Sequence, residues 1–541
     1  MLEITQLVLP ITHSPEMLRP AVVQALGITE GALLGMEVRQ RAIDARKKSA
    51  VSFVYTVEVR VVDEDAVIQG HQRNLCQVRP APDRIYGALQ ILKSPPLAPD
   101  LRPVIIGTGP CGLFCGLLLA RAGWRPILIE RGKPAGPRAR DVTGFWRGTA
   151  GLEPDSNVQF GEGGAGTFSD GKLYTQIKDR EHRIPWILQE MVVAGAPEDI
   201  LIKARPHIGT DRLIKVVRHL REEIIQLGGE VRFETRFQEL VLDDLGRVTG
   251  ARLASGEILA TAQVILAIGH SSRDTFAALH AQGVTMEAKP LSIGVRVEHP
   301  QAAMDRTQYG VFAGHAALGA APYKFVYHHP QSNRTAYSFC MCPGGLVVAS
   351  SSEPGGLVTN GMSSYARAEA NANAGFMVDV SPADYGSTAD HPLAGVDFQR
   401  HWEQRAFLEG GGNYHAPIQT IGDFLARRPT QQLGAVIPSY RPGVTPSDLR
   451  SCLPDFVLNT LRAAIPMIDR QLRGFANPEA LLTAVETRSS SPVRLTRDPT
   501  TLQSLSTPGL FPAGEGAGYA GGIISAAVDG LKIAEVLLGG C

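Results

Sequence analysis

Three glycine-rich clusters carry the clearest chemical signal in this sequence. Glycine makes up 57 of 541 residues, about 10.5% against a usual ~7%. The clusters are GTGPCG (107–112), FGEGGAGTFSDGK (160–172) and GLFPAGEGAGYAGGIISAAVDG (509–530). Because glycine lacks a Cβ atom, such runs suit tight turns and backbone that lies close against a ligand. The spacing inside the first cluster indicates which ligand that is.

The first cluster has the spacing of a dinucleotide-binding loop. An apolar strand (104–106) precedes it, a helix is expected over 113–122, and a second strand (126–129) ends in Glu130, 23 positions after Gly107. In such a loop the first glycine allows the turn, the second lets the backbone approach a pyrophosphate, and the third lets the helix pack on the strand. The helix N-terminus offers free N–H groups to the phosphates. We expect Glu130 to accept hydrogen bonds from the adenosine ribose.

The other two clusters favour FAD over NAD. In the third, a strand (510–513) reaches Gly514 and Glu515, and a new helix begins near Gly521 and Gly522. In flavoproteins this arrangement places an acid near the ribityl and pyrophosphate groups and a helix N-terminus near the pyrimidine edge of the flavin, where negative charge develops on reduction. Nicotinamide enzymes have no use for a second such unit. The predicted cofactor is non-covalent FAD. The predicted contacts are Gly107, Gly109, Pro110, Cys111, Gly112, Glu130, Arg131, Gly163, Gly164, Gly166, Thr167, Phe168, Phe237, Gly269, Gly514, Glu515, Gly521, Gly522 and Ile523.

Composition excludes several other classes of protein. Fifty-three Lys and Arg balance fifty-three Asp and Glu, which argues against a generally basic nucleic-acid binder. Seven scattered cysteines do not form a disulfide framework and favour a reducing compartment. The N-terminus has no basic segment followed by an apolar run, so no signal peptide is predicted. We expect a cytoplasmic enzyme with a small-molecule substrate, no membrane segment and no metal.

The predicted fold class is α/β, with a Rossmann-like FAD-binding domain interrupted by an α+β substrate domain. A small ferredoxin-like α+β domain precedes it, with strands near 2–9, 34–44, 51–62 and 75–78 and a helix over 15–26. The predicted boundaries are 1–92 (N-terminal domain), 93–103 (Pro-rich linker), 104–285 and 481–541 (FAD domain), and 286–480 (substrate domain).

Basic residues gather on the N-terminal domain. Arg39 and Arg41 share a strand face, and Arg46, Lys47 and Lys48 follow at a turn. They form either a contact site for nucleic acid or a partner protein, or a solvated strand edge protected by charge.

The three clusters resemble those of FAD-dependent oxidoreductases whose FAD domain matches that of p-hydroxybenzoate hydroxylase. More closely, the chain is similar to a bacterial family of FAD-dependent dehydrogenases. This similarity extends over nearly the whole chain, through IDARKK (43–48), AIGHSSRDTF (267–276), YSFCMCPGG (337–345), VTNGMS (358–363), GGNYHAPIQTIGDFL (411–425) and VETRSSSPVR (485–494). It implies the cofactor and the fold, and it leaves the substrate open. By the family pattern, backbone near Arg236 and Phe237 meets the adenine, and the strand ending in Gly269 packs near the adenosine.

The middle of the chain is expected to complete this fold. The periodicity predicts helices over 210–227, 363–377, 397–408 and 446–473, and strands over 231–237, 261–269, 291–298, 337–341 and 345–350. After strand 261–269, the segment from His270 to Asp274 either lies near the FAD or caps the next helix. No second GxGxxG motif occurs in a strand–helix–strand setting. NAD(P)H would therefore dock transiently, or the substrate itself supplies the hydride.

Four residues are candidates for catalysis. Cys340 and Cys342, two apart on a predicted strand, would share a face as a redox or substrate-contacting pair, or be two small buried side chains. His415, after three glycines, is either a general acid or base or a structural histidine. Arg488 could neutralise an anionic substrate or join two domains. The preferred function is an FAD-dependent oxidoreductase; the alternatives are a flavin monooxygenase using NAD(P)H and O2, and an RNA- or partner-binding flavoprotein.

Overall fold

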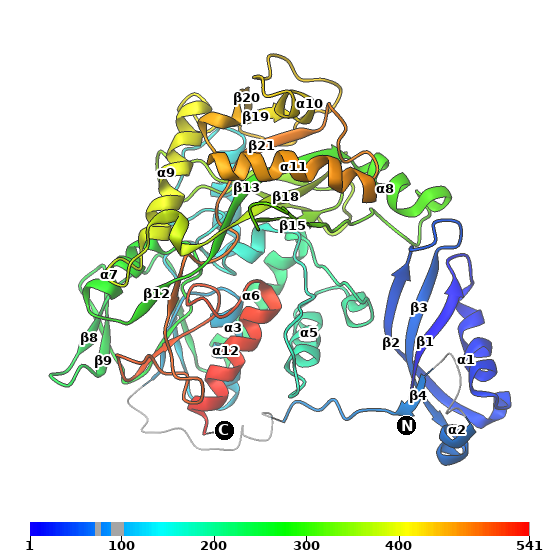
Figure 1. Ribbon diagram of the computed structural model, residues 1–541. Coiled ribbons are helices and arrows are strands. Elements are labelled where there is room, and N and C mark those ends of the chain that lie inside the picture. The colour runs from blue at the N-terminus through cyan, green and yellow to red at the C-terminus, as the bar shows by residue number, and fades with distance from the viewer. Residues whose placement is uncertain (71–76, 88–101, 540–541) are drawn as a thin grey trace.

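The computed structural model describes residues 1–70, 77–87 and 102–539, and the strands in these ranges form six sheets (Figure 1). The first sheet, at the N-terminus, is antiparallel with the order β2-β3-β1-β4. One helix follows β1 and another follows β3, which is the β-α-β-β-α-β order of a split βαβ unit. Its elements are β1 (Leu2–Pro10), α1 (Leu18–Leu26), β2 (Leu33–Asp44), β3 (Ser52–Val61), α2 (Glu64–Gly70) and β4 (Gln77–Pro80).

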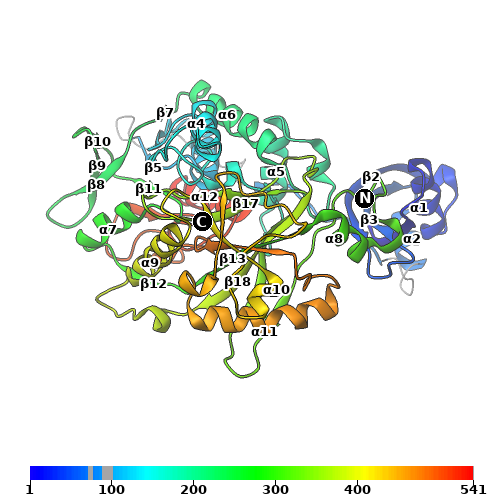
Figure 2. The same ribbon diagram turned by 90° about the horizontal axis from the view of Figure 1, so that it is seen from above.

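The N-terminal unit stands to one side of the molecule and is attached near α8 (Gln301–Tyr309), as Figure 2 shows. Tyr309, Leu318 and Ala321 join its apolar core, so the two parts share one hydrophobic cluster. A backbone pair between Arg41 and Lys203 adds a second contact. The predicted Pro-rich linker at 93–103 lies almost entirely outside the described residues.

A five-stranded parallel sheet forms the centre of the predicted FAD domain. Its order is β23-β11-β5-β6-β7, with every neighbouring pair parallel. Buried parallel strands of this kind are apolar throughout, as in Val104–Ile106. Its strands come from both sides of the long middle segment: β5 (Val104–Ile106), β6 (Ile127–Ile129), β7 (Glu230–Arg232), β11 (Val264–Leu266) and β23 (Leu510–Pro512).

Helices cover this sheet, and a three-stranded meander extends from it (Figure 1). The helices around it are α3 (Pro110–Arg121), α4 (Ala135–Trp146), α5 (Arg183–Val193), α6 (Thr210–Gln226), α7 (Arg273–Ala281) and α12 (Ile523–Leu537). The meander is β8 (Phe237–Leu242), β9 (Val248–Leu253) and β10 (Ile258–Ala260), and a separate pair joins β12 (Met286–Ala288) to β22 (Val493–Leu495).

A seven-stranded sheet occupies the middle of the chain, in the order β14-β15-β18-β13-β21-β19-β20. The long helix α11 lies across one face of it (Figure 1). The elements are β13 (Leu291–Pro300), β14 (Val326–His328), β15 (Thr335–Cys342), β18 (Asn371–Val380), α9 (Ala394–Glu409), β19 (Ala416–Thr420), α10 (Ile421–Leu425), β20 (Val444–Pro446), α11 (Asp455–Gln471) and β21 (Leu481–Glu486). A two-stranded sheet of β16 (Leu346–Ala349) and β17 (Thr359–Met362) packs beside it.

Three predicted elements are wrong. The expected helix over 363–377 is a turn-containing segment (363–370) followed by strand β18, which is buried on both faces between β13 and β15 and therefore shows no period of two. The expected strand over 231–237 is two strands of different sheets, β7 and β8, separated by a turn. The helix expected to begin at 446 begins at Asp455, after the proline that ends the preceding turn.

No helix within the described ranges is both long and apolar enough to cross a lipid bilayer.

The crossing of α3 and α12 makes a sharp prediction about stability. A Cβ atom on Gly530 would overlap the carbonyl oxygen of Cys111, so Gly530→Ala should destabilise the protein by about 1–3 kcal/mol despite the better helix propensity of alanine. Denaturant unfolding measures this change. Gly151→Ala, which meets no atom within 4 Å, is the control and should leave the midpoint unchanged. An unchanged midpoint in Gly530→Ala would show that the helices can separate freely.

Candidate flavin site

A cavity of about 610 Å³ opens where the three glycine clusters meet. Its size falls in the range of small-molecule and cofactor sites. Residues of all three clusters line it, as do Phe237 and Gly269 from the FAD side. Phe339, Cys340 and Asn360 line it from the seven-stranded sheet and its neighbouring β-ribbon. The cavity therefore lies between the parallel sheet and the inserted part of the chain.

Two helices begin at this cavity with unsatisfied backbone donors. Gly109 caps α3 and Gly522 caps α12, and neither cap makes a side-chain hydrogen bond. Both glycines line the cavity. The free N–H groups and the positive ends of two helices of 12 and 15 residues thus face the same space. This donor set fits the phosphates and the electron-accepting ring of a flavin dinucleotide.

Close packing explains why glycine occupies the first loop. A Cβ atom on Gly107, whose φ is 104°, would overlap the carbonyl oxygen of Ala267. One on Gly112 would overlap the carbonyl oxygen of Gly107. At Gly109 a Cβ atom would touch only Gly164, at 3.8 Å, an ordinary contact. The fold itself therefore requires glycine at positions 107 and 112. At position 109 the protein would tolerate a Cβ atom, and the space left by its absence is available to a ligand.

Arg138, which the sequence analysis missed, holds the second glycine loop in shape. The side chain is fully buried and donates to three carbonyl oxygens of the loop, those of Gly161, Glu162 and Gly164, and to those of Asn157 and Val158 just before it, at 2.6–3.2 Å. Burial lowers the pKa of Arg138 to about 10. A guanidinium has five N–H donors and no acceptor, so its hydrogen-bonding capacity is matched by backbone carbonyls alone.

Glu130 joins the first two glycine loops. Its carboxylate accepts from the backbone N–H groups of Thr108, Gly132 and Gly161, each at 3.0 Å, and from the Thr108 hydroxyl at 2.8 Å. A carboxylate offers about four acceptor positions. Glu130 thus links the two loops at the cavity wall, and the hydrogen bonds from ribose hydroxyls stay a prediction.

The remaining predicted contacts divide into two groups. Pro110, Cys111, Arg131, Gly164, Gly166, Phe237, Gly269, Glu515, Gly521, Gly522 and Ile523 line the cavity, with Gly107, Gly109 and Glu130. Five others lie behind the wall and support it, namely Gly112, Gly163, Thr167, Phe168 and Gly514. Thr167 donates to the carbonyl of Glu162, and Gly514 donates to Asp529 at 2.7 Å.

Glu515 faces the cavity with its carboxylate unused by the protein. No donor within the described part of the chain forms a hydrogen bond to its side chain. Burial raises the pKa of Glu515 to about 7, and the charge of Lys289 opposes that rise. This acid can therefore hold or release a proton near neutral pH.

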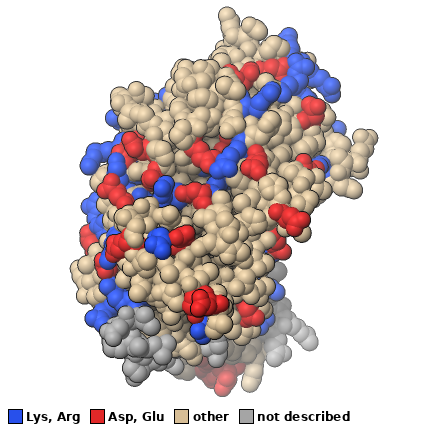
Figure 3. All heavy atoms as spheres, turned by 90° about the vertical axis from the view of Figure 1, so that its left-hand side faces the viewer, with Lys and Arg blue, Asp and Glu red and all other residues tan. Residues whose placement is uncertain are grey.

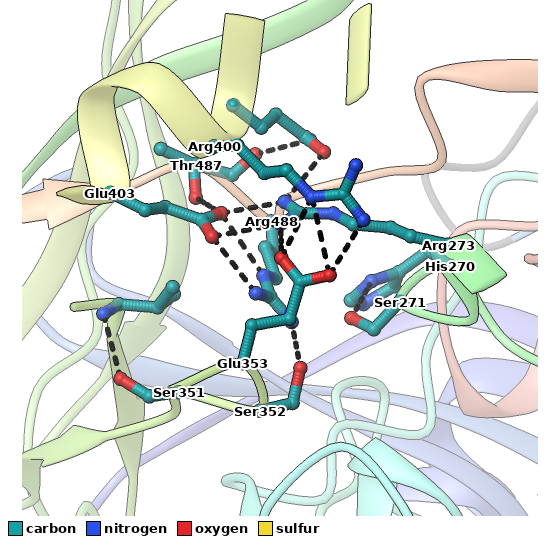
Figure 4. A network of polar contacts seen from close by, with 12 residues as sticks. His270, Ser271, Arg273, Ser351, Ser352, Glu353, Arg400, Glu403, Thr487 and Arg488 are labelled. Carbon is teal, nitrogen blue, oxygen red and sulfur yellow. Dashed lines mark hydrogen bonds and ion pairs between the residues drawn. The ribbon is translucent and has the colours of Figure 1, made fainter. Parts of the chain in front are cut away.

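Arg488 lines the cavity, and its charge is partly balanced by Glu403. Its guanidinium bonds to both carboxylate oxygens of Glu403, at 3.1 and 2.9 Å, and to the Ser352 hydroxyl. Glu403 also receives Arg273 from the FAD side, at 2.7 and 2.9 Å. Figure 4 shows Arg273, Arg400 and Arg488 converging on Glu353 and Glu403. Joining the two parts of the chain is the observed role.

The other candidates are placed very differently from one another. Cys340 lines the cavity, and Cys342 is buried behind it. His415 is not among the cavity-lining residues; it packs against Gly443 at the edge formed by β19 and β20. His270, which is half-buried, does line the cavity, and desolvation together with the charges of Arg488 and Arg273 lowers its pKa to about 3, so it is neutral.

A family model described as "FAD-dependent protein, C-terminal domain-like" matches residues 290–489. A protein of Clostridium beijerinckii, described as uncharacterized, is 43% identical over 540 residues, which is 99% of this chain and 98% of that protein. The chain belongs to this family of FAD-dependent proteins. The predicted FAD-dependent oxidoreductase family is thereby confirmed, and the flavoprotein is an enzyme. A second model, a domain of unknown function, matches residues 1–60.

Solved structures resemble the flavoprotein only distantly. L-proline dehydrogenase from P. horikoshii is 11% identical, with a TM-score of 0.34 over 82% of this chain and 95% of that one. A geranylgeranyl bacteriochlorophyll reductase-like protein from Thermoplasma acidophilum is 14% identical, with a TM-score of 0.34 over 81% and 78%. Scores this low support no particular activity.

Changing Arg138 to Lys should weaken FAD binding. Lysine has three donors on a single nitrogen at the end of a shorter, unbranched side chain and cannot serve five carbonyls, so at least two lose their partner. With about 0.5–1.5 kcal/mol per lost bond, the dissociation constant for FAD should rise about tenfold or more, as measured by flavin fluorescence titration. The exposed Arg147, changed to Lys, is the control. Equal affinity for FAD in Arg138→Lys and in the wild type would show that the hydrogen bonds of Arg138 do not shape the FAD site.

Glu515 should make the stability of the flavin-free protein depend on pH. Because burial raises its pKa from the ordinary 4.5 to about 7, the folded protein is penalised once the carboxyl ionises. The penalty is absent below about pH 4.5 and complete above about pH 7. Glu515→Gln should therefore melt near the wild type at pH 5 and on the order of 1–3 °C higher at pH 8.5. The exposed Glu369, changed to Gln, is the control; a pH-independent difference would contradict the assignment.

Proposed function

We propose that this flavoprotein binds FAD across the cavity and transfers a hydride between the flavin and a small organic substrate. The observation that carries the proposal is the cavity itself. Two uncapped helix N-termini and the glycine loops line one side, and side chains of the inserted sheet line the other. The bound flavin would supply the two-electron chemistry.

The protein's own groups have distinct parts in this proposal. The free N–H groups at Gly109 would hold the pyrophosphate, and those at the start of α12 would stabilise negative charge on the flavin ring. Glu515, with its pKa of about 7, is the group best able to hold or pass a proton. Arg488 shares the charge of Glu403 with Arg273, so its own charge is only partly balanced, and it would be a group at the cavity wall that attracts an anionic substrate.

The second candidate function is that of a flavin monooxygenase, which would use the same cofactor. NAD(P)H is proposed as a transient reductant in either case, because the described chain carries one five-stranded parallel sheet, and Gly107–Gly112 is the GxGxxG match that lies in a strand–helix–strand unit of it.

The nucleic-acid alternative is less well supported. Arg39 pairs with Glu58 at 2.7 Å and Arg46 pairs with Asp44 at 2.6 Å, so the basic residues of the N-terminal unit are partly neutralised. Figure 3 shows the side of the molecule opposite the N-terminal unit, and there too positive and negative side chains are intermixed. Neither observation describes a continuous basic surface.

Purification and anaerobic reduction test the proposed function. The protein should carry one FAD per chain, and NADH or NADPH should bleach its spectrum. Slow reoxidation by air supports a reductase, whereas substrate-stimulated oxygen use with a hydroxylated product supports a monooxygenase. A colourless protein that cannot bind added FAD would refute the proposal.

Gly109→Val should abolish FAD binding without unfolding the protein. A Cβ atom at this position makes only one ordinary contact with the protein, so the valine methyl groups extend into the cavity instead. We expect a normal unfolding midpoint and no flavin released on denaturation. Gly109→Ala, with a smaller side chain, should retain part of the FAD. Stoichiometric FAD in Gly109→Val would show that the loop does not contact the cofactor.

A further inference from the structure

The Cys340–Cys342 segment is the most unusual piece of backbone at the cavity. The register between β15 and β18 shifts between Phe339 and Cys342, so the strand bulges there. Cys340 has a φ of 39°, a left-handed conformation that non-glycine residues rarely adopt. This irregularity replaces the regular strand expected from the sequence, and it presents Cys340 to the cavity. Such conformations persist only where the surroundings hold them.

Arg296 is the residue that holds the bulge. It is fully buried, donates to the carbonyl oxygen of Cys340 at 2.9 Å, and pairs with Glu486 at 2.6 Å. Glycines make room for this ion pair. A Cβ atom on Gly361 would overlap the Arg296 guanidinium, and one on Gly375 would lie 2.8 Å from the Glu486 carboxylate. The buried ion pair of Arg296 and Glu486, for which the two glycines leave space, thus fixes the backbone of Cys340.

The surroundings shift the pKa values of the two thiols in opposite directions. The Cys342 thiol donates to the Cys340 carbonyl at 3.2 Å. The interaction with the neighbouring Cys342 side chain lowers the pKa of Cys340 well below its usual range, and the charges of Lys172 and Arg296 add to this. The same interaction, together with burial, raises the pKa of Cys342. One thiolate next to one thiol is the reactive form of a dithiol pair.

Lys172 supplies a positive charge on the cavity side. It lines the cavity with Cys340 and pairs with Asp170 at 3.2 Å. Asp170 in turn is bonded by Arg367, at 2.9 Å for one of the two contacts. The other described cysteines contrast with this setting. Burial raises the pKa values of Cys111, Cys115 and Cys452, so these thiols stay protonated.

We propose that Cys340 and Cys342 form a redox-active dithiol that passes two electrons to the bound FAD. The proposal rests on the flavin function proposed above. In the step, an S–S bond forms between the two sulfur atoms and the S–H bond of Cys342 breaks. Two electrons and the proton of Cys342 pass to FAD, which is the oxidant. A thiolate, a thiol and oxidised FAD thus become a disulfide and the reduced flavin anion, so atoms and charge balance. The reverse step reduces the disulfide.

Counting electrons tests this proposal without any substrate. A protein whose only redox group is FAD takes up two electrons per chain in an anaerobic dithionite titration. After oxidation with ferricyanide, the wild-type holoprotein should take up four, two for the flavin and two for the disulfide. Cys340→Ser and Cys342→Ser should each take up two. Cys452→Ser, a buried cysteine away from the cavity, is the matched control and should take up four.

Mass spectrometry of the wild-type protein tests the disulfide directly and does not depend on whether a variant folds. Trypsin should release Thr335–Arg367, a peptide whose only cysteines are Cys340 and Cys342. From the oxidised protein, alkylated before digestion, this peptide should appear two hydrogens lighter and unalkylated. From the reduced protein it should carry two alkyl groups.

The outcomes separate this proposal from the flavin function. FAD bound with a two-electron uptake, and a doubly alkylated peptide after oxidation, would overturn the dithiol and leave the flavin function intact. Four-electron uptake that persists in Cys340→Ser would also overturn it. A protein unable to bind FAD would refute the flavin function and, with it, the electron transfer.

Discussion

The five hydrogen bonds from Arg138 to the second glycine loop and the residues just before it are the interaction on which the site depends. Glycine-rich backbone gains little from side-chain packing, and its buried carbonyl groups need hydrogen-bond donors. One buried guanidinium supplies those donors. It also fills the space beside Gly161, where a Cβ atom would overlap its side chain. The loop is therefore shaped before any cofactor arrives, which is the pre-organisation that tight binding requires.

Two further constraints place the inserted sheet against this loop. Glu130 bonds both glycine loops together, and Glu403 joins arginines from the two parts of the chain (Figure 4). Buried charges of this kind cost free energy to desolvate and stabilise little by themselves. What they provide is geometry. They bring Cys340 on its bulge to the wall of a cavity whose opposite side is formed by α3 and α12.

The cofactor-binding loops could be predicted because local backbone geometry requires glycine at particular positions, and the spacing of those glycines can be recognised in the sequence. Gly107 and Gly112 are where backbone meets backbone, and no other residue fits. The hydrogen bonds of Arg138 to the second glycine loop could not be predicted, because Arg138 lies in a charged helical segment whose sequence resembles that of a solvent-exposed helix. Strand β18 was predicted as helix because burial on both faces removes the alternation that identifies strands. Cys340 lines the cavity, and its predicted role in catalysis stays a prediction, whereas His415, which was proposed because of its glycine neighbours, lies elsewhere.

A crystal structure with FAD tests the central claim most directly. The account predicts the pyrophosphate at the backbone of Gly109, the adenosine toward Arg131 and Phe237, and the isoalloxazine ring at the end of the cavity lined by Cys340 and Glu515. Density for FAD in the opposite orientation, with its adenine beside Cys340, or density outside this cavity, would contradict it.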